Sequence, residues 1–231
     1  MKKSAILFSA ILFQTISMFG QNQTYDNFQG TKVVQYGEKT GTFDSLSPNP
    51  APNSVNEKVK CAKYVRNSEK KFDVLKMTFS SNLSDSSVNK YATYLGIPPK
   101  LKMKVYTSAP VGTLVEILLG SKGGNNAYPG GTHSQYQAYT TKSNGWEELE
   151  FKFSQIPKGS ETSASQIDQL TVLFSPNSAS SDTFYFSDIS GPELGPKKMP
   201  ELASTKNETK KPVKNDDKKT TTKTEVKKPK K

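Results

Sequence analysis

Cysteine, histidine and tryptophan are almost absent from this chain, which has one of each in 231 residues. A single cysteine, Cys61, excludes a disulfide within the monomer and a cysteine-rich zinc site. A single histidine, His133, excludes a metal triad with two imidazoles, and Ser-His-Asp chemistry would have to use this one residue. Most familiar enzyme constellations are therefore excluded by residue count.

Long apolar runs are also missing, except for one at the N-terminus. Met1, Lys2 and Lys3 precede a largely apolar run over residues 4–19, and Gly20 follows it. This order is typical of a secretory signal peptide, and the run is shorter than the about 20 residues that span a bilayer. We expect a signal peptide over residues 1–20 and a mature protein in the periplasm, at the cell surface or outside the cell, without a transmembrane segment. A buried helix or a membrane anchor is the alternative.

The chain has a formal net charge of +11, and most of this excess lies at the C-terminus. Residues 197–231 hold 13 lysines and 5 acidic residues, whereas residues 21–196 hold 17 basic and 16 acidic residues. A nearly neutral body lacks the basic face of a nucleic-acid-binding domain. The tail has no aromatic residue and few aliphatic ones, so we expect it to be disordered. It either contacts anionic polymers of the cell envelope or acts as a solubilising spacer.

The body, residues 21–196, shows the period-two pattern of β-strands. Apolar residues alternate with Lys102 and Lys104 over residues 101–105, and with charged residues over 147–153. Turns rich in glycine, proline and asparagine separate the strands. About ten short strands predict an all-β fold, an antiparallel β-sandwich of the jelly-roll kind. Further strands are expected over residues 32–37, 41–46, 61–66, 73–79, 113–119, 134–141, 169–175 and 183–189.

Five stretches of the body occur together in an order that is known from other proteins. They are 26–30 (Asp-Asn-Phe-Gln-Gly), 49–53 (Asn-Pro-Ala-Pro-Asn) with 63–67, 127–131 (Ala-Tyr-Pro-Gly-Gly) with 133–134, 145–147 (Gly-Trp-Glu), and 173–177 (Leu-Phe-Ser-Pro-Asn) with 184–189. This set resembles a group of secreted bacterial jelly-roll domains, which is similar to the carbohydrate-binding modules of the galactose-binding-like fold. The resemblance implies a module that binds polysaccharide without cleaving it.

The same resemblance implies a structural calcium ion. In such modules, an acidic or amide residue near the first strand and an acidic residue in the last strand share the ion. The matching positions are Asp26 or Gln29 and Asp188. Calcium takes six to eight oxygen ligands, and this chain has Gln29 and Ser187 where relatives tend to have acids. The alternative is that Asp26 caps a turn and that Asp188 is a solvated strand-end residue.

The candidate sugar site is the segment from residue 125 to residue 139, which is rich in tyrosine, amides and glycine. Sugars stack on flat aromatic rings, and amide or imidazole groups hold their hydroxyls. Trp146 is either an exposed platform for stacking or a lid over the sheet edge, while the tyrosines and the histidine have structural roles as the alternative. The residues that we expect to bind carbohydrate are Tyr94, Tyr128, His133, Gln135, Tyr139 and Trp146.

Glu148 and Glu150 offer an enzymatic interpretation. They share one strand face at a separation of about 6.7 Å, which a glycosidase could use. However, Lys152 shares this face, and nothing apolar on it would raise a carboxyl pKa. We therefore expect a non-catalytic polysaccharide-binding module. The alternative is a structural or adhesive envelope protein, whose sandwich binds a protein partner and whose tail contacts anionic surface polymers.

Removal of residues 197–231 is expected to leave the melting transition unchanged, because every alternating segment ends before Gly195. The shortened protein should also lose most of its retention on an anionic column, since the tail carries 8 of the 11 net positive charges. Calorimetry and salt-gradient elution measure the two effects. A large fall in melting temperature would show that the tail packs on the sandwich.

Overall fold

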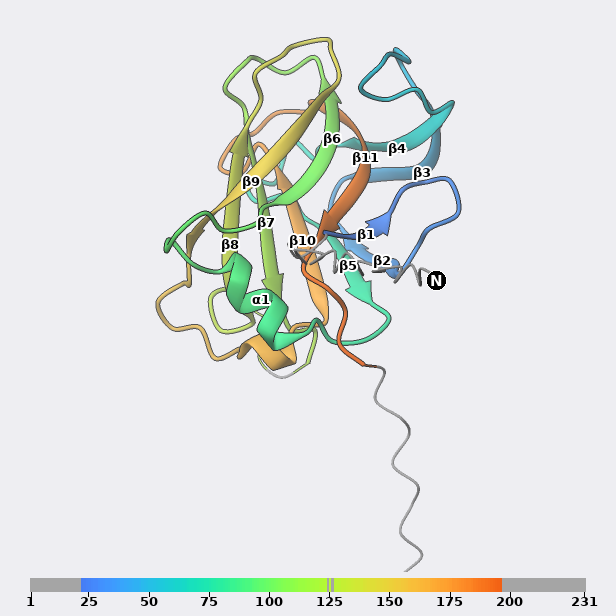
Figure 1. Cartoon of the computed structure of the whole chain (residues 1–231). Coiled ribbons are helices and arrows are strands. Elements are labelled where there is room, and N and C mark those ends of the chain that lie inside the picture. The colour runs from blue at the N-terminus through green and yellow to red at the C-terminus, as the bar shows by residue number, and fades with distance from the viewer. Residues whose placement is uncertain (1–21, 124, 126, 197–231) are drawn as a thin grey trace, which may run out of the picture. The chain divides into compact units, whose positions relative to one another are not determined.

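The computed structural model describes residues 22–196 except residues 124 and 126, so the expected signal peptide and tail lie outside the described residues (Figure 1). β-strands dominate this part of the chain, together with a short helix, α1 (Asp85–Tyr91), and a 3₁₀ turn (Ala164–Gln166). No helix in this part is long and apolar enough to cross a bilayer. The strands are β1 (Gln23–Asp26), β2 (Val34–Lys39), β3 (Thr42–Pro48), β4 (Lys60–Val65), β5 (Leu75–Phe79), β6 (Leu101–Thr107), β7 (Leu114–Gly120), β8 (Thr132–Tyr139), β9 (Glu147–Gln155), β10 (Gln169–Phe174) and β11 (Thr183–Gly191).

The strands form two antiparallel sheets. The first sheet has the order β3, β4, β11, β6 and β9, with β1 paired to the end of β11, and the second has the order β2, β5, β10, β7, β8 and β9. β9 belongs to both, because residues 147–151 pair with β6 and residues 152–155 pair with β8. The prediction of an all-β antiparallel sandwich of the jelly-roll kind is confirmed.

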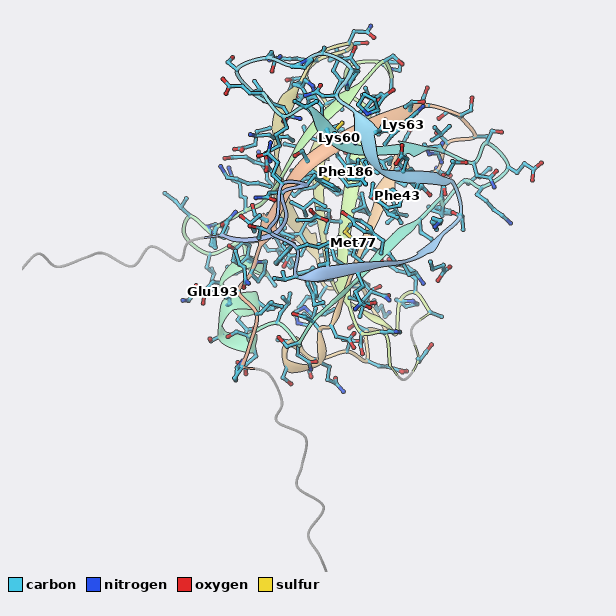
Figure 2. The ribbon with its side chains drawn as sticks, turned by 90° about the vertical axis from the view of Figure 1, so that its right-hand side faces the viewer. Phe43, Lys60, Lys63, Met77, Phe186 and Glu193 are labelled. Atoms are coloured by element: carbon cyan, nitrogen blue, oxygen red, sulfur yellow. The ribbon has the colours of Figure 1, made fainter. Side chains whose placement is uncertain are left out.

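The core lies between the two sheets and is rich in aromatic rings. Phe174 of β10 stacks on Phe184 with ring centroids 4.7 Å apart and lies 5.5 Å from Phe186, so β10 and β11 contact each other across the sandwich. Figure 2 shows Phe186 beside Phe43 near the edge formed by β2 and β3. Because alternate residues of each strand fill this core, the residues between them face outward.

The sequence did not predict β1 or α1. β1 has four residues and is mostly polar, so it shows no alternation of its own. α1 has seven residues, of which Val88 and Tyr91 supply the buried apolar surface. A helix of this length is too short to show periodicity over a dozen residues, and its packing depends on tertiary contacts.

Candidate functional site

The outward face of the second sheet forms the floor of a groove of about 1040 Å³. The floor crosses β9, β8, β7, β10, β5 and β2, and at the usual strand spacing this amounts to about 24 Å. One wall is the loop between β7 and β8, which contributes Tyr128. The opposite wall, at the other end of the strands, contributes Phe72 before β5 and Pro176 after β10. The groove is therefore long enough for an extended chain.

The strand register arranges the floor in rows. Leu118 of β7 pairs with Thr171 of β10 and with Gln135 of β8. The next row pairs Glu116 with its neighbours in β10 and β8 in the same way. As a result, the leucines of the floor lie on β7 and β10, while Gln135, Gln137 and Gln155 lie on β8 and β9.

The amides are held in fixed orientations by hydrogen bonds to each other and to a carboxylate. Gln155 Nε2 donates to Gln135 Oε1, and Gln137 Nε2 donates to Glu116 Oε2 at 2.7 Å. Within the described residues, the side chains of Gln135 and Gln155 make no other hydrogen bond. Gln135 Nε2 and Gln155 Oε1 therefore have no partner. The exposed Gln155 and the half-buried Gln137 thus present donors and acceptors to a ligand, whereas Gln135 is only 6% exposed.

The charges on the floor nearly cancel. Lys76 of β5 forms an ion pair with Glu38 of β2 at 2.8 Å. Glu116 is the remaining carboxylate that lines the groove within the described residues. The lining therefore carries one more negative than positive charge, and it does not attract a polyanion.

Tyr128 and Phe72 are large rings that remain exposed at the groove, by 57% and 62%. The loop that carries Tyr128 is fastened at Gly130, whose carbonyl accepts bonds from Glu161 N at 3.0 Å and from Thr162 Oγ1 at 2.9 Å. Sequence reasoning missed Phe72, and the signal that would have found it is a lone ring in the charged stretch 70–73 (Lys-Lys-Phe-Asp).

The structure brings two of the expected sugar-binding residues, Tyr128 and Gln135, to this groove. Tyr139 projects from the same face of β8 and is exposed, but it lies outside the groove lining, beside Leu114. Tyr94, His133 and Trp146 are not part of the groove lining.

Tyr94 and His133 have local structural partners instead. The Tyr94 ring packs against Phe153 with centroids 4.7 Å apart. His133 is buried, with Nδ1 3.1 Å from Ser134 Oγ, and burial lowers its pKa. A neutral, enclosed imidazole is poorly placed to contact a chain in the groove.

The interpretation of Trp146 as an exposed platform is wrong. The residue is fully buried, its Nε1 donates to Asn49 Oδ1 at 2.9 Å, and its ring lies 5.8 Å from that of Tyr106. Strand alternation placed Trp146 on the outer side of the first sheet, where Tyr106 also lies. Asn49 comes from the segment between β3 and β4, which covers this side, and alternation alone gives no sign of such a cover.

Glu148 and Glu150 lie on the first sheet and are paired with lysines. Lys102 Nζ is 2.9 Å from Glu148 and 3.0 Å from Glu150, and Lys100 Nζ is 2.8 Å from Glu150. Hydrogen bonds from Lys100 and Lys102 lower the pKa of Glu150. A general acid needs a raised pKa, so this pair lacks the environment of a glycosidase.

Two of the three expected calcium ligands, Asp26 and Asp188, have partners within the protein. Asp26 accepts hydrogen bonds from Phe28 N at 2.7 Å and from Tyr36 OH at 3.1 Å, while Gln29 is exposed. Asp188 forms ion pairs with two lysines. The described residues contain no group of three His, Cys, Asp or Glu side chains that could hold a metal ion. Because the carboxylates of Asp26 and Asp188 are engaged by these partners, two of them lysines, the residues present do not fit calcium.

Comparison with known proteins gives similarity at the level of structure. No family model and no curated protein matches the chain. Among solved structures, it is similar to a family 11 carbohydrate-binding module from Clostridium thermocellum in complex with a β-1,3-1,4-mixed-linked tetrasaccharide, at 12% identity and a TM-score of 0.44 over 75% of this chain and 96% of the module.

Two further structures are similar to a comparable extent. A family 30 carbohydrate-binding module has 14% identity and a TM-score of 0.44 over 78% of this chain and 93% of the module. The low-affinity xylan-binding module CBM86 from Roseburia intestinalis has 11% identity and a TM-score of 0.37 over 76% and 97%. At these values the likeness is one of general β-sandwich architecture.

Substitution Trp146→Ala is expected to lower the free energy of unfolding by about 3–5 kcal/mol, because it leaves a large cavity under the β3–β4 segment. The affinity of the folded fraction for a groove ligand should not change. Denaturant titration and binding at a temperature where the variant is folded measure the two quantities. A variant as stable as the parent that no longer binds would show that Trp146 contacts the ligand.

Proposed function

We propose that this protein is a non-catalytic binding module and that a polysaccharide chain lies in the groove of the second sheet. The observation that carries the proposal is the composition of one continuous surface. It combines oriented amides on the floor with exposed rings, Tyr128 and Phe72, on opposite walls. Sugar hydroxyls need paired donors and acceptors, whereas the C–H faces of a pyranose need a flat apolar partner.

The charge of the lining favours a neutral chain. Lys76 is already paired with Glu38, and Glu116 adds a negative charge that no lysine of the lining balances. A polyanionic chain would bring its carboxylates or sulfates next to these acids in a partly desolvated groove, where like charges repel most strongly. We therefore propose a neutral polysaccharide as the ligand.

The position of the groove carboxylates supports binding without hydrolysis. Glu116 lies on β7 and Glu38 lies on β2, and three strand spacings separate these strands. This corresponds to about 14 Å, whereas the two carboxyl groups of a glycosidase are about 5–9.5 Å apart. The two acids therefore cannot act together on one glycosidic bond.

A protein partner is the second candidate, and the aliphatic strip on the floor favours it. Leu114, Leu118 and Leu173 line the groove and would suit the side chains of an extended peptide better than a sugar ring. The two candidates differ in how they use the amides, because a polysaccharide offers hydroxyls along its whole length. We further propose export across the cytoplasmic membrane, on the basis of the signal-like N-terminus, and a weak contribution of the lysine-rich tail to anionic surfaces.

Substitutions Tyr128→Ala and Phe72→Ala are each expected to weaken binding about tenfold or more, since loss of a stacking ring costs about 1–3 kcal/mol. Tyr94→Ala is the matched control, because Tyr94 is an exposed tyrosine outside the groove. Affinity electrophoresis with mixed-linkage glucan, xylan and polygalacturonate measures the effect at low and high salt. Each neutral polymer should retard the protein to the same extent at both salt concentrations, since the contacts are not ionic.

Two results would contradict the proposal. One is equal retardation of the parent and of both ring variants. The other is retardation only by polygalacturonate that disappears at high salt, which would assign binding to the basic tail. Tyr139→Ala, in the same assay, tests the expectation from the sequence that Tyr139 also binds carbohydrate, although it lies outside the groove lining.

A further inference from the structure

Lys58 lies in the segment before β4, and its ammonium group is surrounded by oxygen atoms from distant parts of the chain. The side chain is 14% exposed. Its Nζ lies 2.9 Å from the backbone oxygen of Asn27 and 3.2 Å from Ser187 Oγ, and it forms a short contact with Asp188 Oδ1. These partners come from the β1–β2 connection and from β11.

The three partners match the bonding capacity of the ammonium group. A lysine ammonium has three donors, and a carbonyl, a hydroxyl and a carboxylate each accept one of them. A calcium ion would need six to eight oxygens at 2.3–2.6 Å. The three oxygen atoms around this position therefore match the Lys58 ammonium group and are too few for a calcium ion.

The remaining charges at this position disfavour a divalent ion. The second oxygen of Asp188 is buried and accepts no hydrogen bond within the described residues, but it lies 2.9 Å from Lys104 Nζ, so two lysines flank one carboxylate. A calcium ion placed beside Asp188 would meet both ammonium groups, and their repulsion would offset its attraction to this carboxylate. Asp26, the other acid nearby, is engaged by Phe28 N and Tyr36 OH.

We propose that the Lys58 ammonium is a built-in structural cation, which takes the position that the resemblance to calcium-containing modules assigned to a metal. It joins three segments that are far apart in sequence, as a bound ion would. The protein therefore reaches its full stability without calcium, and it keeps that stability in the presence of a chelator.

The backbone near both ends of this contact is shaped to bring the groups together. β11 changes register between Ser187 and Ser190, and Asp188 adopts a left-handed conformation with φ of 53°. On the other side, Asn49 Nδ2 donates a hydrogen bond to the backbone oxygen of Lys58 at 2.7 Å. Since Asn49 Oδ1 also accepts the bond from Trp146, the segment that Lys58 anchors is the one that covers Trp146.

The test compares Lys58→Met with Lys60→Met, because Lys60 is an exposed lysine two residues away. The melting temperature of each protein is measured with added calcium chloride and with EDTA. The parent should melt at the same temperature under both conditions. Lys58→Met should melt about 5–10 °C lower, since it leaves Asp188 with one partner fewer, and Lys60→Met should melt like the parent.

Trp146 provides a readout that a general loss of stability would not move. It is the single tryptophan of the chain and is fully buried, so acrylamide quenching of its fluorescence reports on the segment that covers it. Well below the melting temperature, quenching should increase several-fold in Lys58→Met and stay unchanged in Lys60→Met. Asp188→Asn should show the same increase, and asparagine tolerates the left-handed conformation at this position.

A parent melting temperature that rises with calcium or falls with EDTA would overturn the proposal. So would a Lys58→Met protein with the melting temperature and quenching of Lys60→Met. If Lys58→Met does not fold, the calcium and EDTA measurements on the parent and the quenching of Asp188→Asn still decide between the two outcomes.

Discussion

The apolar layer between the two sheets is the constraint on which the rest of the structure depends. Phe174 packs across this layer on Phe184 and Phe186, and this packing fixes which residues of β10 face inward. Since side chains alternate along a strand, the same packing turns Leu173 and Thr171 outward to the floor of the groove. A shift of one residue in register would exchange core and groove, so the fold and the binding surface are specified together.

Strand alternation is also why the sequence predicts so much of the fold. The outward direction of Gln135 and Tyr139 follows from the pattern in β8 alone. Loop contacts do not follow from it, because they depend on segments far away in the chain. The cover over Trp146, which Asn49 helps to form, and the position of Phe72 opposite Tyr128 appear only when the strands are assembled. The segments outside residues 22–196 stay predictions.

The calcium expectation shows the same limit in terms of charge. The sequence presents acids at the two matching positions, Asp26 and Asp188, but it does not show which cation lies beside them. Lys58 is 130 residues from Asp188 along the chain and contacts it directly. Carboxylates near a strand end are therefore consistent with either a metal ion or a lysine beside them. Which cation lies there depends on the segments that the fold brings next to the carboxylates.

The central claim is that the groove of the second sheet is the binding surface, and the side-chain amide signals of its glutamines test this most directly. An isotope-labelled protein titrated with a mixed-linkage glucan oligosaccharide gives these signals by NMR. The account predicts that the amides of Gln135, Gln137 and Gln155 shift in a saturable manner and that residues of the first sheet do not. Shifts confined to the first sheet or to the lysine-rich tail would contradict it.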